Sequence, residues 1–570
     1  MGKNSGFRRS AWLIPLAIFT VAFLVRMAFV MQAKGSPYWR VPLVDAQTYD
    51  QAAQDLLKTH WLGPLPTRTS PRMPYFQPPL YQGFLAFIYL IFGHSIIIAI
   101  IIQYLISSLA CVLTYFIGRR VFGMGVGIAA GVASAFTASQ IFYDGRLLPP
   151  VLITILNLTI LLLAIKQTKS PRTWRWPVIG LLLGLSAITR PDILLFVPVL
   201  LVWMWLERKS VLPTKPMMWT AIVLAGVLLP IGLVAVRNRV VGKDSVLISY
   251  NGGLNFFVGN YPNMEKTLAI RPGGKWYKLI QGPVSRGITR PSQLDRFYYK
   301  TTLGLMWKYK RMAALNFAKK LIWVWRGQEI RRNEDDYYLT RISSLYRVLL
   351  WRHGSFGFPF GVIAPLALLG LALFPRKQEL FLLYGLVITQ VLALVLFFPC
   401  SRYREPLIPI FLMFGAAAVF EMANLVRGKR FGDLAPVLVL LVAFSAVPTL
   451  WPPTFEGTPA QIEAENHRIL GLACYREEQT DRAIAEYMKC LAMTPNDSEA
   501  QMLLMIAYLR QGNLLDAERY AKSFLRLEPD SQFGYQALER IYKAEGRYAD
   551  AEGVRKVLGT GRGVANYGTH

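Results

Sequence analysis

The sequence predicts an all-α membrane protein, in which a polytopic bundle of about eleven spans is followed by a C-terminal α-helical repeat array. Hydrophobic residues occupy 53% of the 570 positions, which is too many for an ordinary soluble protein. Many apolar runs approach or exceed the roughly 20 residues that a helix needs to cross a bilayer. After Trp451-Pro452-Pro453 the composition becomes charged, and a repeat begins.

The apolar runs fall into two groups, separated by a long polar segment at 237–357. The predicted spans are 12–31, 95–117, 123–142, 147–165, 177–190, 192–207, 217–236, 358–374, 380–398, 405–426 and 433–450. A further run at 80–92 has only 13 residues, so we expect an interfacial or re-entrant helix there. The predicted regions are a membrane module at 1–236 with an outer loop at 32–92, the outer segment 237–357, the last spans at 358–450 and the repeats at 465–558.

Basic residues indicate the orientation of the spans. Lys3, Arg8 and Arg9 precede the first span and place the N-terminus in the cytoplasm. If 80–92 does not cross, the basic clusters of the later loops all fall on the cytoplasmic side. These clusters are Arg119-Arg120, 166–175, Arg208-Lys209 with Lys215, Arg376-Lys377, and Arg427 with Lys429-Arg430. The C-terminal array is then extracytoplasmic, and the net charge of +29 needs no nucleic-acid partner.

The C-terminal region contains an internal repeat. Ala483, Ala517 and Ala551 are 34 residues apart, and so are Pro495 and Pro529. This is the period of tetratricopeptide repeats, predicted here over 465–558. Such arrays bind protein partners, although three repeats can also form a stable lid. The four cysteines lack the spacing of metal ligands, so we expect no zinc site.

The first outer loop is predicted to hold a short amphipathic helix at 44–57. Its apolar residues recur with helical spacing from Tyr49 to Leu57. Asp45 lies where the N-cap of this helix is expected. Because aspartate is among the best N-caps, Asp45 on its own would have only a structural role.

Further polar residues lie at the ends of spans on the predicted outer face. They are Tyr49, Gln77, Tyr81, Asp144, Arg146, Arg190, Asn255, Arg402, Tyr403 and Arg404. Each alone could be an interfacial anchor, but polar groups at membrane depth are costly and tend to be functional. Six loops contribute to this set, which together with Asp45 predicts an active site at the outer membrane surface.

Four motifs of this face carry a resemblance to a known superfamily. They are Asp45 with Tyr49, Gln77-Pro78-Pro79-Leu80-Tyr81, the loop from Tyr250-Asn251-Gly252-Gly253 to Gly259-Asn260, and Ser401-Arg402-Tyr403-Arg404-Glu405-Pro406. In their order and common side, residues 10–450 resemble the C-type membrane glycosyltransferases that use polyprenyl-phosphate sugars. These include protein O-mannosyltransferases and lipid A aminoarabinose transferases. The resemblance implies an enzyme of the bacterial plasma (inner) membrane that transfers a sugar, with inversion, to a protein, lipid or glycan acceptor.

The proposed chemistry gives each candidate residue a task. A carboxylate must take the proton of the acceptor hydroxyl, and Asp45 is the candidate. Cationic side chains must balance the departing phosphate, and the fork of Arg402 or Arg404 suits this best. Many relatives have a second acid directly after the first, whereas this chain has Ala46. We therefore expect a metal-independent site without a cofactor, with a divalent metal left open.

Three other classes of function compete with this interpretation. A lipid-linked sugar transporter or flippase would also have many spans with polar groups, but we see no internal hydropathy repeat. A non-catalytic anchor that displays the repeats would not require Asp45 or the outer arginines. A polysaccharide polymerase or ligase is another membrane transferase that can carry such repeats.

Overall fold

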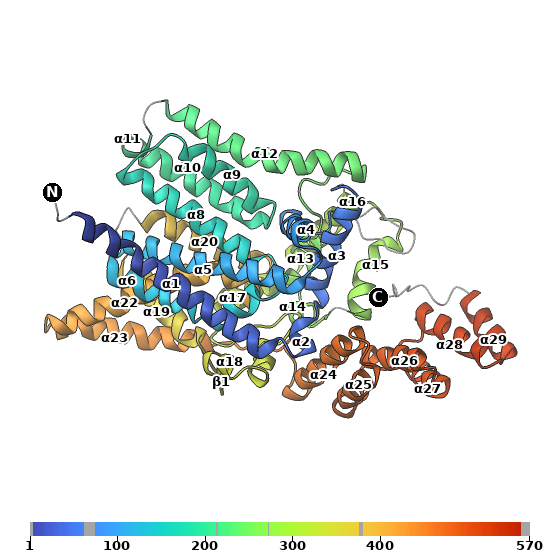
Figure 1. The fold of residues 1–570 in the computed structure, drawn as a ribbon. Coiled ribbons are helices and arrows are strands. Elements are labelled where there is room, and N and C mark those ends of the chain that lie inside the picture. Colours follow the sequence, from blue (N-terminus) through green and yellow to red (C-terminus); the bar gives the residue numbers. More distant parts are fainter. Residues whose placement is uncertain (1–3, 62–74, 213–214, 272, 375–379, 560–570) are drawn as a thin grey trace.

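The computed structural model describes residues 4–61, 75–212, 215–271, 273–374 and 380–559. These ranges fold almost entirely into helices (Figure 1). The sheet found in them is one antiparallel hairpin, in which β1 (Trp351–His353) pairs with β2 (Phe356–Phe358) and Arg352 lies opposite Gly357. Lys3 and the predicted basic pair Arg376-Lys377 lie outside the described residues.

The membrane part is a bundle of apolar helices with a few short helices between them. Its helices are α1 (Asn4–Ala33), α5 (Ile96–Val121), α6 (Met124–Ala135), α7 (Ala138–Asp144), α8 (Pro150–Lys169), α9 (Arg175–Ala187), α10 (Phe196–Leu206), α11 (Arg208–Val211), α12 (Pro216–Gly242), α19 (Phe360–Leu373), α20 (Phe381–Leu396), α22 (Ile408–Arg427) and α23 (Phe431–Ala446). Short 3-10 turns adjoin three of them: η1 (Pro191–Leu195), η4 (Glu405–Leu407) and η5 (Val447–Thr449).

Six helices of the described ranges are long and apolar enough to cross a membrane, or seven if α6 and α7 form one span. These two helices are bent by 54° where the sequence predicts one span at 123–142. The spans predicted at 177–190, 192–207, 358–374 and 380–398 correspond to shorter apolar helices. The count of eleven spans therefore stays a prediction.

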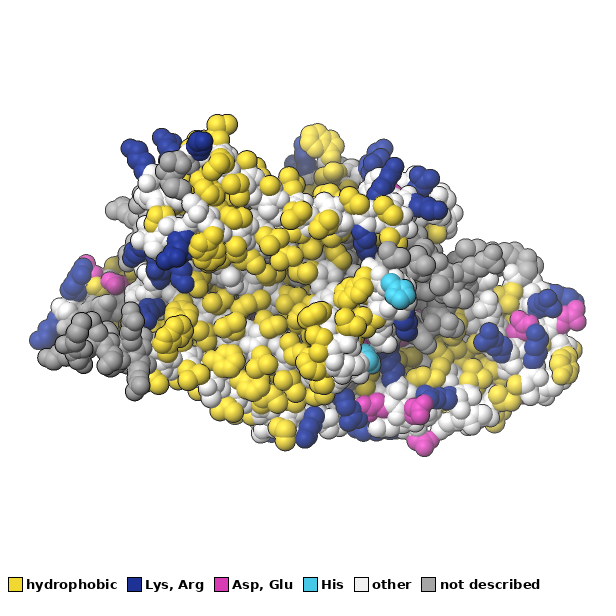
Figure 2. Space-filling view, turned by 45° about the horizontal axis from the view of Figure 1, so that its top comes forward, with side chains coloured by type: hydrophobic (Ala, Val, Ile, Leu, Met, Phe, Trp, Pro, Cys, Tyr) yellow, Lys and Arg dark blue, Asp and Glu magenta, His cyan; other side chains and the backbone are white. Residues whose placement is uncertain are grey.

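Small residues allow the closest contact between helices of the bundle. A Cβ on Gly180 of α9 would lie 2.4 Å from the carbonyl oxygen of Val223, and a Cβ on Gly226 of α12 would lie 2.8 Å from Gly180. Without side chains at this crossing the two backbones pack directly, as is common between helices in lipid. Hydrophobic side chains cover the middle of the bundle's surface, and Lys and Arg side chains gather towards its two ends (Figure 2).

Most of the other helices before the C-terminal array lie towards the end of the bundle opposite the start of α1 (Figure 1). These other helices are α2 (Pro37–Arg40), α3 (Val44–Lys58), α4 (Leu80–Phe92), α13 (Gly252–Asn260), α14 (Met264–Leu268), α15 (Gly274–Val284), α16 (Pro291–Lys308), α17 (Lys310–Val324), η2 (Asp336–Arg341), α18 (Ser344–Leu349) and α21 (Ser401–Arg404). The helix predicted at 44–57 is confirmed, and 80–92 is a helix with the predicted bounds. This end of the bundle carries the candidate site.

Six helices form the C-terminal array beside this end of the bundle (Figure 1). They are α24 (Pro459–Arg476), α25 (Thr480–Met493), α26 (Ser498–Gln511), α27 (Leu514–Leu527), α28 (Gln532–Ala544) and α29 (Tyr548–Gly559). The helices pack as successive pairs, and the repeated alanines Ala483, Ala517 and Ala551 are buried between them. α24 also contacts α2 of the outer layer. The tetratricopeptide assignment itself stays a prediction.

Candidate active site

The site is organised around the carboxylate of Asp45. Helix α3 begins at Val44, its N-cap position is Leu43, and no side chain caps it. The prediction that Asp45 is the N-cap is therefore wrong. Asp45 lies in the first turn of the helix, and its side chain binds Arg402 and Asn333 instead of backbone N–H groups of α3. Oδ2 of Asp45 accepts hydrogen bonds from Nη1 of Arg402 at 2.6 Å and from Nδ2 of Asn333 at 2.8 Å. Both bonds use Oδ2, so Oδ1 has no hydrogen-bond partner within the described ranges.

The backbone just before Asp45 is strained. Val44 has a φ of +51°, in the left-handed region that β-branched residues rarely adopt. Such a conformation costs on the order of 1–3 kcal/mol and is found preferentially at functional sites. The strain is consistent with a backbone that is held in place to present the Asp45 carboxylate.

Two arginines flank the ring of Tyr403. The guanidinium of Arg402 lies 5.0 Å from the ring centroid and that of Arg190 lies 4.6 Å from it. Arg190 also donates to the carbonyl of Tyr403 at 3.2 Å and pairs with Asp192 at 2.9 Å. Because cations are attracted to the faces of aromatic rings, Tyr403 holds the two positive groups close together. Three of the predicted residues thus form one cationic cluster beside Asp45.

A pocket opens between the Asp45–Arg402 pair and residues 332–334 of the outer segment, none of which was predicted as a site residue. The residues that line it are Asp45, Ala46, Phe142, Tyr143, Leu148, Arg332, Asn333, Glu334 and Arg402. Three of these residues, Arg332, Asn333 and Glu334, come from the outer segment. In the sequence, the dense charged run at 331–336 is the one feature that could have pointed to them. Nη1 of Arg332 donates to the carbonyls of Leu268 and Ile270, and burial lowers the pKa of this guanidinium.

Arg146 does not line the pocket but supports a residue that does. It is buried, forms an ion pair with Glu334, and donates to the carbonyls of Trp39 at 2.7 Å and Tyr38 at 3.1 Å. Burial raises the pKa of Glu334, and the charge of Arg146 opposes that shift. Arg146 therefore fixes one member of the pocket lining.

Asp144, Tyr49 and Tyr81 do not line the pocket and make structural contacts. Asp144 accepts from Ser107 and lies 3.9 Å from Arg26, a buried cation within α1. Tyr49 and Tyr81 are buried and contact each other edge to face at 5.0 Å. These contacts order the helices around the pocket.

The remaining predicted residues lie apart from the pocket. Arg404 is buried, pairs with Glu329 at 2.8 Å and donates to the carbonyl of Arg326 at 2.8 Å. Gln77 and Asn255 are half-buried, and neither lines the pocket. The two arginines that the sequence could not distinguish therefore have different surroundings, and only Arg402 contacts Asp45.

The described residues contain no group of three or more His, Cys, Asp or Glu side chains that could hold a metal ion. The carboxylates of Glu334 and Asp144 are already paired with Arg146 and Arg26. The residues present at Asp45 therefore do not fit a metal centre, and we derive no step through a metal.

A family model described as dolichyl-phosphate-mannose-protein mannosyltransferase matches residues 76–232. Residues 76–232 resemble this mannosyltransferase family. The resemblance predicted from the sequence is thereby confirmed for that stretch, which includes Tyr81, Asp144, Arg146 and Arg190 but neither Asp45 nor Arg402. Among proteins with curated functions, none matches the chain.

Three solved structures show distant similarity. An oligosaccharyltransferase of Archaeoglobus fulgidus, in complex with Zn and sulfate, is 13% identical with a TM-score of 0.44, over 81% of this chain and 56% of that one. The chain thus covers little more than half of that protein. AglB of the same organism, in complex with an inhibitory peptide and a dolichol-phosphate, is 13% identical with a TM-score of 0.44, over 94% and 72% of the two chains. ArnT from Cupriavidus metallidurans, bound to undecaprenyl phosphate, is 14% identical with a TM-score of 0.41, over 90% and 80%.

Proposed function

We propose that the chain is a membrane glycosyltransferase that moves a sugar from a polyprenyl-phosphate donor to an acceptor hydroxyl. The observation that carries this proposal is the Asp45–Arg402 pair, which places a carboxylate with an unused oxygen beside an arginine at one pocket. The mannosyltransferase match supports the reaction class. The acceptor, whether protein, lipid or glycan, and the identity of the sugar are left open.

The reaction needs one base and one cation. The acceptor oxygen attacks the anomeric carbon, the bond from that carbon to the phosphate oxygen breaks, and the anomeric centre inverts. The proton of the acceptor passes to Oδ1 of Asp45, a transfer that requires hydrogen-bond distance between the two oxygens. The polyprenyl phosphate leaves with a negative charge, which Arg402 balances through charge-assisted hydrogen bonds.

Helix α4 is the candidate contact for the lipid tail of the donor. It packs against α3, the helix of Asp45, and exposes Phe87 at 56%, Leu90 at 60% and Ile91 at 56%. An exposed apolar face of this size suits lipid rather than water. A polyprenyl chain along α4 would bring its phosphate to the end of the bundle where Arg402 lies.

The proposed location is the plasma (inner) membrane, with the site and the C-terminal array on the extracytoplasmic side. The positive-inside distribution of the loop arginines and lysines supports this orientation. The array offers a surface for a protein partner, as tetratricopeptide repeats commonly do.

The proposal is tested with the purified full-length protein in lipid nanodiscs. A panel of radiolabelled polyprenyl-phosphate sugars is supplied with protein, lipid and glycan acceptors, and released polyprenyl phosphate is measured together with labelled product. We expect release with at least one donor and its loss in Asp45→Asn. Movement of the labelled lipid across vesicles without release would indicate a flippase, and elongation of a glycan from a lipid diphosphate would indicate a polymerase. Either result would overturn the proposal.

A further inference from the structure

We infer that helix α24 of the C-terminal array is part of the site, because its Glu465 and Asn466 are positioning residues for the pocket segment 331–336. The expected effect on sugar transfer rests on the proposed function. The effect on the conformation of the segment does not, so the two can fail separately.

The segment 331–336 divides its side chains between the pocket and the array. Arg332, Asn333 and Glu334 line the pocket, and Asn333 donates to Asp45. The residues on either side of them, Arg331 and Asp335, bind α24 instead. The array therefore holds the residues on both sides of 332–334, and the middle residue of that stretch, Asn333, contacts the proposed base Asp45.

The first of these ends is a buried ion pair. Nη1 of Arg331 donates to Oε2 of Glu465 at 2.8 Å, and Nη2 donates to the carbonyl of Glu456 at 2.5 Å. The backbone N–H of Arg331 donates to the carboxylate of Glu456 at 3.3 Å. The side chains of Arg331 and Glu465 are 8% and 12% exposed. Because these charges are largely out of water, removing one of them leaves an uncompensated charge and is strongly destabilising.

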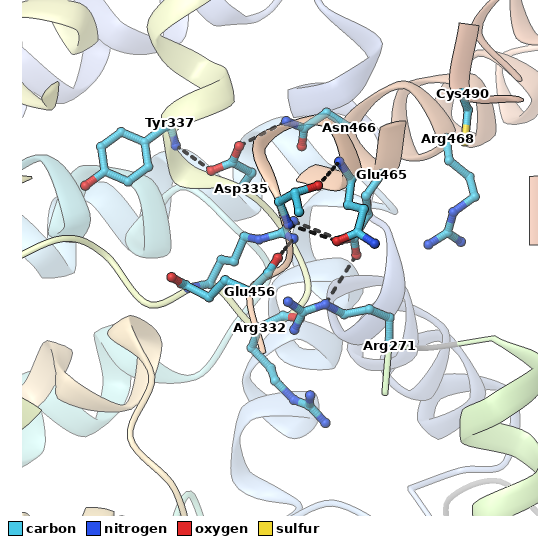
Figure 3. A network of polar contacts seen from close by, with 12 residues as sticks. Arg271, Arg332, Asp335, Tyr337, Glu456, Glu465, Asn466, Arg468 and Cys490 are labelled. Carbon is cyan, nitrogen blue, oxygen red and sulfur yellow. Dashed lines mark hydrogen bonds and ion pairs between the residues drawn. The ribbon is translucent and has the colours of Figure 1, made fainter. Parts of the chain in front are cut away.

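The second end is a hydrogen bond between an amide and a carboxylate. Nδ2 of Asn466 donates to Oδ2 of Asp335 at 3.0 Å, while Oδ1 of Asp335 accepts from the backbone N–H of Tyr337 at 3.2 Å. The N–H of Asp335 in turn donates to the hydroxyl of Tyr38 at 3.2 Å. Figure 3 shows Asn466 of α24 directed at one side of the Asp335 carboxylate and Tyr337 at the other.

Arg271 gives Glu465 a second route to the pocket. Its Nε lies 3.5 Å from Oε1 of Glu465, and its Nη1 donates to the carbonyl of Arg332 at 2.8 Å (Figure 3). Burial lowers the pKa of Arg271 to about 10, and Glu465 opposes that shift. One carboxylate of the array therefore orders both Arg331 and, through Arg271, the backbone of a residue that lines the pocket.

Other ion pairs join the array to the outer layer without reaching the pocket. Glu463, two residues before Glu465 on α24, pairs with Arg341 at 2.5 Å, and the Arg341 side chain is 57% exposed. Glu463→Gln removes a carboxylate from the same helix without touching 331–336, so it is the control for a general loss of charge from α24.

The experiment uses the full-length protein with Glu465→Gln, Asn466→Asp, the double variant Asn466→Asp with Asp335→Asn, and the control Glu463→Gln. Hydrogen–deuterium exchange is followed in peptides that cover 331–336. Turnover and KM for the acceptor are measured with the donor panel. Glutamine keeps the shape of Glu465 but removes its charge, and Asn466→Asp places two carboxylates face to face. The double variant restores an amide–carboxylate pair with the donor and acceptor exchanged.

We expect about tenfold faster exchange of the segment in Glu465→Gln and Asn466→Asp, the signature of local opening. Turnover should fall by roughly a hundredfold, because a displacement of about 1 Å of positioned groups can cost that much. Acceptor KM should change less than turnover. The double variant should recover both exchange and turnover, and Glu463→Gln should match the wild type in both.

Unchanged exchange of 331–336 in both single variants would overturn the inference, whatever the activity. So would an equal effect of Glu463→Gln, or a double variant no better than Asn466→Asp. A wild-type protein that transfers no sugar would overturn the proposed function instead, while the exchange data would still decide whether α24 holds the segment.

Discussion

Replacing Asp45 by Asn separates a structural role of this residue from a catalytic one. An asparagine at this position has nearly the same shape, and its carbonyl oxygen can still accept the hydrogen bond that Asn333 donates. It has no charge to pair with Arg402, and it cannot take a proton. Asp45 does not cap α3 with its side chain, so no N-cap energy is lost in this variant.

The expected loss of folding stability and the expected loss of transfer rate in Asp45→Asn differ in size. The Asp45 side chain is 31% exposed, so solvent screens much of its attraction to Arg402, and its loss should cost about 1 kcal/mol of folding stability. General-base catalysis contributes roughly a hundred- to ten-thousandfold in rate. At about 1.4 kcal/mol for each factor of ten, that is roughly 3–6 kcal/mol in the activation barrier. The fall in rate should therefore far exceed any fall in stability.

The assay is single-turnover transfer at saturating acceptor, with thermal unfolding and donor binding measured on the same preparations. Asp45→Asn should lose at least about a hundredfold in rate while it still unfolds cooperatively and binds donor. Asp45→Glu keeps a base displaced by one methylene and should retain part of the activity. Asp55→Asn, on the same helix, is the matched control and should behave as the wild type. A full transfer rate in Asp45→Asn would refute the assignment of Asp45 as the base.

Three further predictions concern the arginines, a buried lysine and the topology. Arg402→Lys should slow transfer by roughly a hundredfold or more because the bidentate fork is lost, whereas Arg404→Lys should mainly lower thermal stability; equal effects on rate would contradict this. Burial lowers the pKa of Lys320 to about 7, and the unfolded value is about 10.4, so the unfolded chain binds more protons between these values. Stability should therefore rise with pH above about 7, by up to about 1.4 kcal/mol per unit, and thermal scans of Lys320→Met should show a weaker rise. A reporter fused after Arg430 should indicate the cytoplasm and one fused after Gly559 the outer compartment; a cytoplasmic signal after Gly559 would exclude eleven spans.

The features that the sequence could predict are those set by local physics. Apolar periodicity located α3, an apolar run too short to cross a bilayer located α4, and the 34-residue spacing located the paired helices of the array. Run length was less informative where two apolar helices meet at a bend, because no charged residue marks the break between α6 and α7. Many of the outer helices lie together at one end of the bundle (Figure 1). This is consistent with the prediction from the basic clusters that the outer loops lie on one side of the membrane.

The pairing of the site residues could not be predicted, because it depends on contacts between distant parts of the chain. Asn333 and Arg402 lie 288 and 357 residues after Asp45, and nothing local marks either as its partner. Arg402 and Arg404 occur in one short motif, yet a rotation of about 100° per residue along a helix sends them to different neighbours. The run at 331–336 lies inside the long polar segment predicted at 237–357, and in the fold it lies between the pocket and α24.

The contact between Asp45 and Arg402 brings together two groups with opposite tasks in the proposed reaction. Of the five N–H groups of Arg402, one donates to Asp45 and one to the hydroxyl of Tyr403. The other three have no partner among the described residues and could donate to phosphate oxygens. As Asp45 accepts the proton of the acceptor, its negative charge disappears and its attraction to Arg402 weakens. In the same step the departing phosphate gains negative charge. The positive charge that the carboxylate no longer balances thus becomes available to the phosphate, so proton transfer to Asp45 and stabilisation of the leaving group assist each other.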